Sequence, residues 1–226
     1  MDRLRYLLLS FVVLVPLIMA RSAQADWLDD LRLGGYVIVI RHCATFSNQA
    51  DTDPLNIKNV AAQRQLSEQG RAQAKAIGQS MRRLGIPVGM VVTSHFQRAV
   101  ETGTLMGYGD VTPTADVAEG GLVVSPEENA RRAQALRNLA GAFPPPDNNL
   151  VIVTHKPSIM DAFGKDWFDV REGEASVFEP DGNGAYKLIV RIQASEWTGL
   201  VKSSRDVSAS QTRGLHILRS SSPSTD

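Results

Sequence analysis

Short runs of apolar, β-branched residues recur along this chain, and longer stretches with helical spacing separate them. Three such runs, at residues 36–40, 90–93 and 150–154, each predict a buried strand. Apolar residues that recur at helical spacing predict helices between them. The predicted helices are at residues 67–84, 96–106, 126–143 and 157–163. Strands that alternate with helices in this way indicate an α/β fold.

Turn and capping signals add detail to this pattern. Ser67 is a suitable N-cap for the first of these helices. Residues 181–184, Asp-Gly-Asn-Gly, form a strong turn signal between strands expected at 177–180 and 186–192. We therefore expect a three-layer sandwich with a mostly parallel central sheet, to which an antiparallel C-terminal hairpin adds near one edge.

Polar, reactive residues stand at the carboxyl ends of the three central strands. Arg41 and His42 follow the first strand, Ser94 the second and His155 the third, and Arg98 lies one helical turn beyond Ser94. Because parallel strands place their carboxyl ends at the same edge of a sheet, where ligands bind in open α/β folds, these residues are expected to converge.

Two imidazoles and two guanidiniums in one crevice suit a phosphomonoester substrate. Guanidinium groups match phosphate oxygens in bidentate geometry and stay charged at any working pH. A neutral imidazole can attack phosphorus to give a phosphohistidine, which water later resolves. A carboxylic acid must protonate the leaving alcohol and then deprotonate that water. This scheme needs no metal and no cofactor.

Several short motifs, in this order, resemble those of the histidine phosphatase superfamily. Residues 41–48 (Arg-His-x-x-Thr-x-x-Asn) are similar to the first motif of the family, residues 94–102 to the second and residues 153–155 to the third. Residues 66–74 also resemble the opening of the family's first helix. The resemblance implies the phosphoglycerate-mutase-like fold over roughly residues 36–192.

The family also implies roles for individual residues. His42 is expected to be the nucleophile, with Arg41, Arg98 and His155 as its catalytic partners. The expected phosphate-binding residues are Arg41, Thr45, Asn48, Ser94, Arg98 and His155.

The first motif departs from the family pattern at two positions, and the sequence offers two candidates for the general acid. Cys43 and Ala44 stand where the family usually has Gly and often has Glu. In one branch the acid is a Glu after the second motif, for which Glu119 is the first candidate and Glu174 the second. In the other branch an Asp follows the second histidine, but here that position is Lys156.

Other chemistry is less well supported by the residues. A catalytic thiol at Cys43 is disfavoured because position 49 is Gln, where a Cys-x5-Arg loop needs Arg. His95 is expected at the rim of the pocket. The motifs lack a carboxylate at ligand spacing from His42 or His155, so no metal is expected.

The N-terminal residues are typical of an export signal. Arg3 and Arg5 precede an apolar run at residues 6–19, and Ala-Gln-Ala at 23–25 is a small-x-small cleavage pattern. We expect residues 1–25 to be a signal peptide that is removed before Asp26. This predicts a periplasmic or secreted protein with no membrane span after cleavage.

The remaining chain is expected to form one domain at residues 26–202, followed by a disordered polar tail at 203–226. The full chain has 24 basic and 24 acidic residues, and removal of three arginines and one aspartate with the signal leaves 21 and 23. Such balance gives no electrostatic case for nucleic acid as a partner.

The expected function is that of an exported phosphomonoester hydrolase. Its substrate or partner is expected to be a small phosphoester or a phosphorylated envelope glycan, and segments 49–65 and 108–125 are expected to roof the pocket and set its specificity. The alternatives are a catalytically weak protein of the same fold that binds a phosphoglycan or a partner, a phosphomutase, and a metal-binding export protein. The oligomeric state is left open.

Overall fold

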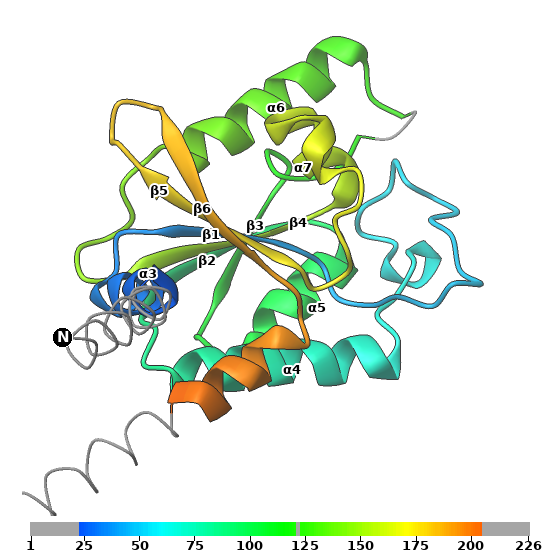
Figure 1. Cartoon of the computed structure of the whole chain (residues 1–226). Helices are drawn as coiled ribbons and strands as arrows, with labels where there is room; N and C mark the ends of the chain where they lie inside the picture. The colour runs from blue at the N-terminus through cyan, green and yellow to red at the C-terminus, as the bar shows by residue number, and fades with distance from the viewer. Residues whose placement is uncertain (1–22, 121–122, 205–226) are drawn as a thin grey trace, which may run out of the picture.

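A six-stranded mixed sheet forms the centre of the protein. The computed structural model describes residues 23–120 and 123–204, and in Figure 1 the sheet lies between two layers of helices. The strand order is β3-β2-β4-β1-β5-β6; β1 to β4 run parallel, β5 pairs antiparallel with β1, and β6 with β5. The strands are β1 (Val37–Arg41), β2 (Val88–Ser94), β3 (Val111–Thr114), β4 (Asn149–Thr154), β5 (Ala175–Pro180) and β6 (Tyr186–Ile192). The predicted α/β sandwich with a C-terminal antiparallel hairpin is confirmed.

Alternate residues of β1 face two separate hydrophobic cores. Ile38 and Ile40 belong to the core beneath α3, α4 and α5, whereas Val37 and Val39 belong to the core beneath α6 and α7. Because both faces of the strand are covered, its sequence is apolar throughout instead of alternating. The helices are α3 (Ala23–Leu33), α4 (Glu68–Arg83), α5 (Gln97–Met106), α6 (Pro126–Ala140) and α7 (Lys156–Phe163), with short 3-10 turns η1 (Val60–Ala62) and η2 (Lys165–Trp167).

The register of the parallel strands brings the predicted site residues to one edge of the sheet. Arg41 in β1 pairs with Thr154 in β4, and the pairing of β2 with β4 runs to Thr93. His42 and His155 directly follow β1 and β4, and Ser94 is the last residue of β2, so the three residues stand at the same edge of the sheet.

Local signals explain most helix boundaries. The hydroxyl of Ser67 accepts a hydrogen bond from the backbone N–H of Gly70, so Ser67 is the N-cap that the sequence predicts for α4. α6 ends at Ala140, and not at residue 143 as expected from the sequence. Phe143 precedes a proline, which disfavours helical backbone there, and its side chain is 68% exposed, so no burial favours a longer helix.

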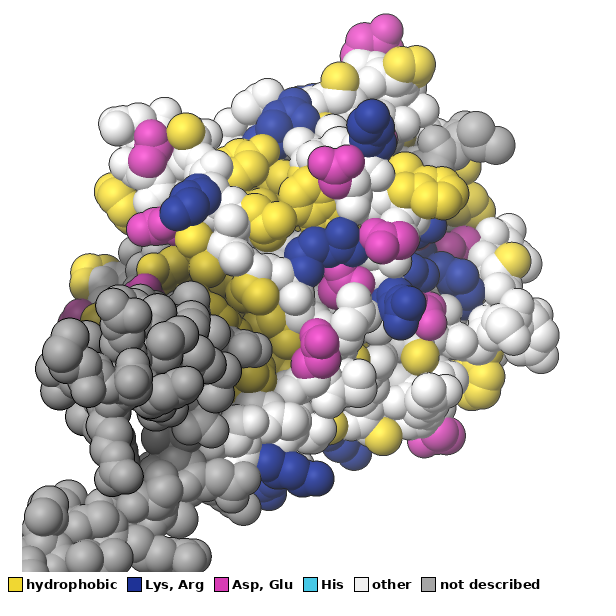
Figure 2. Space-filling model, viewed as in Figure 1, with side chains coloured by type: hydrophobic (Ala, Val, Ile, Leu, Met, Phe, Trp, Pro, Cys, Tyr) yellow, Lys and Arg dark blue, Asp and Glu magenta, His cyan; other side chains and the backbone are white. Residues whose placement is uncertain are grey.

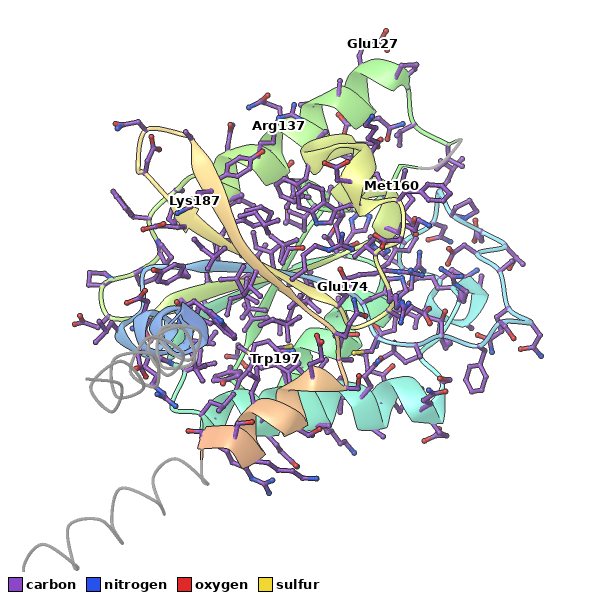
Figure 3. All side chains as sticks on the ribbon, in the orientation of Figure 1. Glu127, Arg137, Met160, Glu174, Lys187 and Trp197 are labelled. Atoms are coloured by element: carbon purple, nitrogen blue, oxygen red, sulfur yellow. The ribbon has the colours of Figure 1, made fainter. Side chains whose placement is uncertain are left out.

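Three elements were not predicted from the sequence. The short strand β3 contains Pro113 and lies at the edge of the sheet, where a residue without an N–H is tolerated. α3 covers the sheet through Leu28 and Leu31. A helix at 196–204 buries Trp197, which Figure 3 shows between this helix and the sheet.

The predicted ends of the chain lie mostly outside the described residues. The structure does not describe residues 1–22 of the expected signal peptide or residues 205–226 of the expected tail. The remaining residues of these two segments are helical: residues 23–25 begin α3, and residues 203–204 belong to the last helix. The burial of Trp197 and Val201 holds this last helix against the core. Within the described ranges, no helix is both long and apolar enough to cross a membrane. Basic and acidic side chains are interspersed over the face shown in Figure 2.

Candidate active site

His42 is fixed at the carboxyl end of β1 by backbone and side-chain hydrogen bonds. Its backbone N–H donates to the carbonyl of Thr154 at 2.9 Å, which ties it to β4. Its ring Nδ1 lies 2.9 Å from the carbonyl oxygen of Cys43. A carbonyl can only accept, so Nδ1 carries the proton and Nε2 keeps its lone pair. Nε2 has no hydrogen-bond partner among the described residues, yet it is not fully enclosed, so it is open to the site.

The environment of His42 keeps its ring neutral. Burial, the neighbouring His155 ring and the charges of Arg98 and Arg41 lower the pKa of His42 well below its ordinary value of 6.5, against the opposing effect of the hydrogen bond to Cys43. The side chain is only 2% exposed. A neutral imidazole with an open Nε2 is the form that can act as a nucleophile.

His155 is the second imidazole of the site, and its ring centre lies 5.2 Å from that of His42. Its Nε2 is 2.7 Å from the hydroxyl oxygen of Ser94, and that oxygen also accepts from the backbone N–H of Phe96 at 3.2 Å. Ser94 therefore orients His155 in this structure. Burial, followed by the charges of Arg98 and Arg64, lowers the pKa of His155 well below 6.5.

Arg98 is a fully buried guanidinium at the start of α5. It pairs with two carboxylates: Nη1 donates to Oδ1 of Asp51 at 3.0 Å, and Nη2 donates to Glu119. Its guanidinium also lies over the ring of Phe96, 4.6 Å from the ring centre. A bound phosphate would therefore compete with Asp51 and Glu119 for this guanidinium.

The two candidates for the general acid lie in different surroundings. Oε1 of Glu119 lies 3.2 Å from Nδ1 of His155, without the geometry of a hydrogen bond, and Glu119 lines the pocket. Glu174 is only 1% exposed and accepts hydrogen bonds from Arg191 and Gln193. Figure 3 shows Glu174 beside the hairpin strands. A carboxylate enclosed by these partners has no open path to a leaving group, whereas Glu119 has one.

Arg41 is held in the site by the segment after η2. Its Nη1 donates to the carbonyl of Val170 at 2.8 Å, and its Nη2 lies 3.7 Å from Oε1 of Glu172. The Nε of Arg41 is buried without a partner among the described residues. This enclosed donor of the guanidinium is therefore unsatisfied in the structure.

Two predicted phosphate-binding residues are used differently in this structure. The backbone N–H and the hydroxyl of Thr45 both donate to Oε1 of Glu172, at 3.3 and 3.0 Å. Asn48 is exposed in the following turn and makes no hydrogen bond with another described residue. Neither residue joins the cluster of His42, Arg98 and His155.

Cys43 fits its place in the first motif. Asp147 is the one non-glycine residue with a positive φ in the described part of the chain, so Cys43 has ordinary backbone geometry and needs no glycine. Its backbone N–H donates to the hydroxyl of Thr102 at 3.1 Å. Burial raises the pKa of the Cys43 thiol to about 12, which disfavours a reactive thiolate.

A cavity of about 440 Å³ opens beside Arg98, and it contains residues that sequence reasoning missed. Its lining residues are Gln49, Ala50, Asp51, Pro54, Arg64, Phe96, Glu119, Gly120 and Val123. Most come from the 49–65 segment and from the stretch before α6, the two segments that the sequence analysis expected to form the roof. Asp51 and Arg64 lie in an aperiodic polar loop, and their only sequence signal was their charge.

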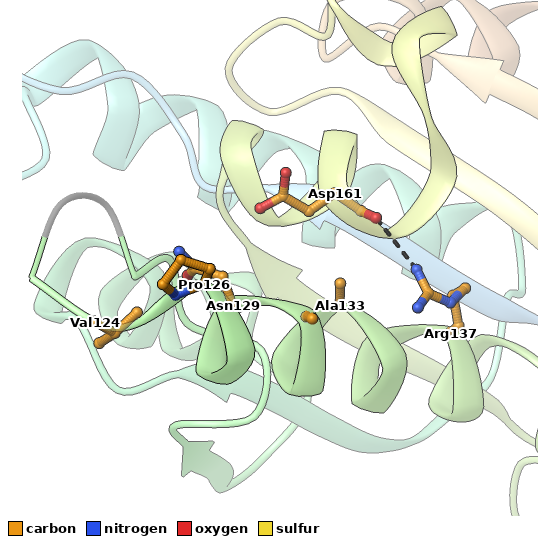
Figure 4. Close-up of a pocket in the computed structure, with 7 residues that line it drawn as sticks. Val124, Pro126, Asn129, Ala133, Arg137 and Asp161 are labelled. Atoms are coloured by element: carbon orange, nitrogen blue, oxygen red, sulfur yellow. Dashed lines mark hydrogen bonds between the residues drawn. The ribbon is translucent and has the colours of Figure 1, made fainter.

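A larger hollow, of about 590 Å³, lies between α6 and α7 and contains none of the predicted site residues. In Figure 4 it runs along α6 from Val124 past Ala133, and Nη1 of Arg137 closes one end by donating to the carbonyl of Asp161 at 3.2 Å. Across the described residues, no group of three or more His, Cys, Asp or Glu side chains is placed to hold a metal ion.

Comparisons with known proteins agree with this geometry at the level of the fold. The model of the histidine phosphatase superfamily (branch 1) matches residues 37–119, a stretch that includes Arg41, His42, Arg98 and Glu119. His155 lies beyond the matched residues. A search of curated proteins found no match.

Solved structures of phosphatases share the fold. The protein histidine phosphatase SixA complexed with tungstate is 15% identical, with a TM-score of 0.50, over 71% of this chain and 98% of that chain. The mycobacterial glucosyl-3-phosphoglycerate phosphatase in complex with inorganic phosphate is 18% identical, with a TM-score of 0.50, over 71% of this chain and 99% of that chain. The fold is the phosphoglycerate-mutase-like fold of histidine phosphatases.

Proposed function

We propose that this protein is a phosphomonoester hydrolase of the histidine phosphatase superfamily that acts through a phosphohistidine intermediate. The observation that carries the proposal is the state of His42. Its Nδ1 proton is committed to the Cys43 carbonyl, its Nε2 keeps its lone pair, and the charges of Arg98 and Arg41 help to lower its pKa. A neutral nucleophile next to fixed cations is the arrangement that phosphoryl transfer to nitrogen requires.

In the first half of the reaction, Nε2 of His42 attacks phosphorus. The N–P bond forms as the bond from phosphorus to the ester oxygen breaks, and Glu119, as a carboxylic acid, gives a proton to the leaving alcohol. Arg41 and Arg98 offset the charge on the transferring group, and His155 supplies a further hydrogen-bonding nitrogen. In the second half, water attacks phosphorus, Glu119 takes a proton from it, and the N–P bond breaks to release phosphate.

The direct test is hydrolysis of p-nitrophenyl phosphate by the full chain, with chelator present, beside the variant His42→Ala. We expect turnover by the wild type that the substitution removes by about three orders of magnitude or more. Equal activity in both proteins would disprove a nucleophilic role for His42. A trapped, acid-labile phosphoryl group on the wild type alone would identify the intermediate.

Two alternative functions from the sequence predict different results in this assay. A phosphomutase would pass the phosphoryl group to a second hydroxyl compound in preference to water, so added phosphate acceptors would raise the yield of new ester. A binding protein would hold phosphate without turnover. The ordinary backbone of Cys43 removes one reason to expect a weakened site.

The proposal includes export and an extracytoplasmic substrate. The basic, apolar and small-x-small pattern at residues 1–25 supports cleavage before Asp26 and a periplasmic or secreted location. A small phosphoester or a phosphorylated envelope glycan is then the substrate class. N-terminal sequencing of the protein recovered from bacterial cell fractions tests this, and an intact Met1 in the cytoplasmic fraction would contradict it.

A further inference from the structure

We propose that Arg64 is a third phosphate-binding guanidinium of the candidate active site and holds an oxygen of the transferring phosphoryl group. The inference rests on the proposed function, because it names a further residue of that same site. Arg64 belongs to none of the three family motifs that the sequence carries. It lies on the 49–65 segment and lines the cavity together with Phe96 and Glu119.

The charge balance of the site singles out Arg64. Arg41 has Glu172 within 3.7 Å, and Arg98 has both Asp51 and Glu119. Between residues 23 and 204, leaving aside 121–122, the structure pairs no carboxylate and no hydrogen-bond acceptor with the Arg64 side chain, although this side chain is partly buried. No nitrogen of the Arg64 side chain is among the enclosed polar atoms without a partner, so its donors face open space and are available to an anion.

Hydrogen bonds on both sides hold the backbone around Arg64. The backbone N–H of Arg64 donates to Oδ1 of Asp51 at 3.0 Å, the same oxygen that accepts from Arg98. On one side of it, Oε1 of Gln63 accepts from the N–H of Gln97 at the start of α5, at 2.7 Å. On the other side, the N–H of Gln65 donates to Oε1 of Gln49 at 2.9 Å. The segment therefore fixes the backbone from which the Arg64 side chain reaches the cavity.

The charge of Arg64 acts on the reacting groups and not only on the rim. After burial and Arg98, it is the next cause that lowers the pKa of His155, and after burial and the opposing effect of Glu172 it also lowers the pKa of Arg41. The geometry agrees with this effect, because Arg64 lines the same cavity as Asp51 and Glu119, the two carboxylates that pair with Arg98. Arg64 thus stands on the wall of the cavity next to the expected phosphate-binding guanidinium and the expected acid. This favours the transferring phosphoryl group over a distant second anion as the partner of Arg64.

The test measures the binding of inorganic phosphate by calorimetry and the hydrolysis of p-nitrophenyl phosphate. The phosphate is the only anionic group of this ester, so an effect on its hydrolysis reports on the phosphoryl group alone. Arg64→Gln is expected to weaken phosphate binding and to lower kcat/KM, each by roughly 10- to 100-fold, the usual effect of losing a charged hydrogen bond. Arg64→Lys should recover part of both losses, because it restores the charge without the fork. Lys58→Gln is the matched control: Lys58 is an exposed cation of the same segment and should change neither value.

The outcomes separate this inference from the proposed function. Unchanged phosphate affinity in Arg64→Gln would overturn the inference even if the wild type hydrolyses esters. 3-Phosphoglycerate, whose alcohol part carries a carboxylate, serves as a second ester. A loss of kcat/KM in Arg64→Gln with this ester but not with p-nitrophenyl phosphate would also overturn the inference, because Arg64 would then recognise the leaving group. Weakened phosphate binding by Arg64→Gln in a protein without turnover would support Arg64 as a phosphate ligand while the hydrolase proposal fails. A failure of the wild type to bind phosphate would overturn both.

Discussion

At the scale of single residues, the fold keeps the two site histidines neutral, and this makes the free energy of unfolding depend on pH. Burial lowers the pKa of His42 and His155 well below 6.5 in the folded protein, whereas both titrate near 6.5 when the chain unfolds. The unfolded state therefore binds more protons below pH 6.5. The free energy of unfolding is fully retained above that pH and falls below it, by up to about 1.4 kcal/mol per pH unit for each histidine.

Urea unfolding between pH 7.5 and 5 measures this loss. His42→Asn and His155→Asn should each flatten the pH dependence, because each removes one buried titrating ring. His95→Asn is the comparison, since His95 is only partly buried and its pKa is lowered first by burial and then by Arg132. Identical slopes for the wild type and the two site variants would show that neither ring is held neutral by the fold.

The sequence could identify the residues whose position follows from a strand end, and it could identify few others. Arg41, His42 and His155 directly follow predicted strands, so their meeting follows from parallel topology. Asp51 and Arg64 come together with Arg98 only through the path of an aperiodic loop. No spacing rule predicts such a path, because the loop is fixed by side-chain hydrogen bonds to α5 and not by a repeating backbone pattern.

At the scale of elements, two helical glycines should respond to the same substitution with opposite signs. A Cβ at Gly70, in the first turn of α4, would overlap the backbone carbonyl of Ala44, two residues after His42. Gly70→Ala should lower the free energy of unfolding by about 2–3 kcal/mol, as overpacking against backbone does, and should reduce hydrolysis by displacing the first motif. At Gly199, in the helix at 196–204, nothing lies within 4 Å of an added Cβ. Gly199→Ala should raise stability by up to about 1 kcal/mol, because alanine favours helix.

Thermal and urea unfolding of the two variants check this pair, with p-nitrophenyl phosphate hydrolysis as the second readout. Gly199→Ala should leave turnover unchanged, since the helix at 196–204 packs on the core face away from the cavity residues. A Gly70→Ala variant with wild-type stability and turnover would mean that α4 can move away from the first motif at little cost.

Helices and strands were predictable from the sequence where the spacing of apolar residues matches the face or faces that are buried. β1 and β4 are apolar along their whole length, and α4 carries both its N-cap and its apolar stripe. β3 and the helix at 196–204 were missed for a common reason: each is short, and each owes its structure to tertiary contacts. β3 pairs with β2 through Val111 to Thr114, and the last helix is anchored by Trp197. Local propensity does not contain those contacts.

At the scale of the whole molecule, the strand order is what turns separate motifs into a site. β2, β4 and β1 are neighbours in the sheet although helices and loops separate them in sequence. The alternation of strands and helices predicts parallel strands, but the order of the strands in the sheet follows from which helices cover which face. The two candidate acids show the same limit: the sequence gives no sign that Glu174 packs against Arg191, whereas Glu119 lines the cavity.

Because the cationic site belongs only to the folded state, its ligand should stabilise the whole domain. Inorganic phosphate at ten times its Kd is expected to add about 1.4 kcal/mol to the free energy of unfolding. For a domain of this size, that corresponds to a rise in Tm of about 3–5 °C. Sodium chloride at the same ionic strength should produce a much smaller rise, since the effect requires an anion that occupies the guanidiniums of Arg41, Arg64 and Arg98. Because the proposed mechanism uses histidine and arginine side chains and no metal, chelator should leave the phosphate-induced rise unchanged. If chelator abolished the rise, phosphate would be held through a metal ion, and the assignment of the three arginines as its ligands would be wrong.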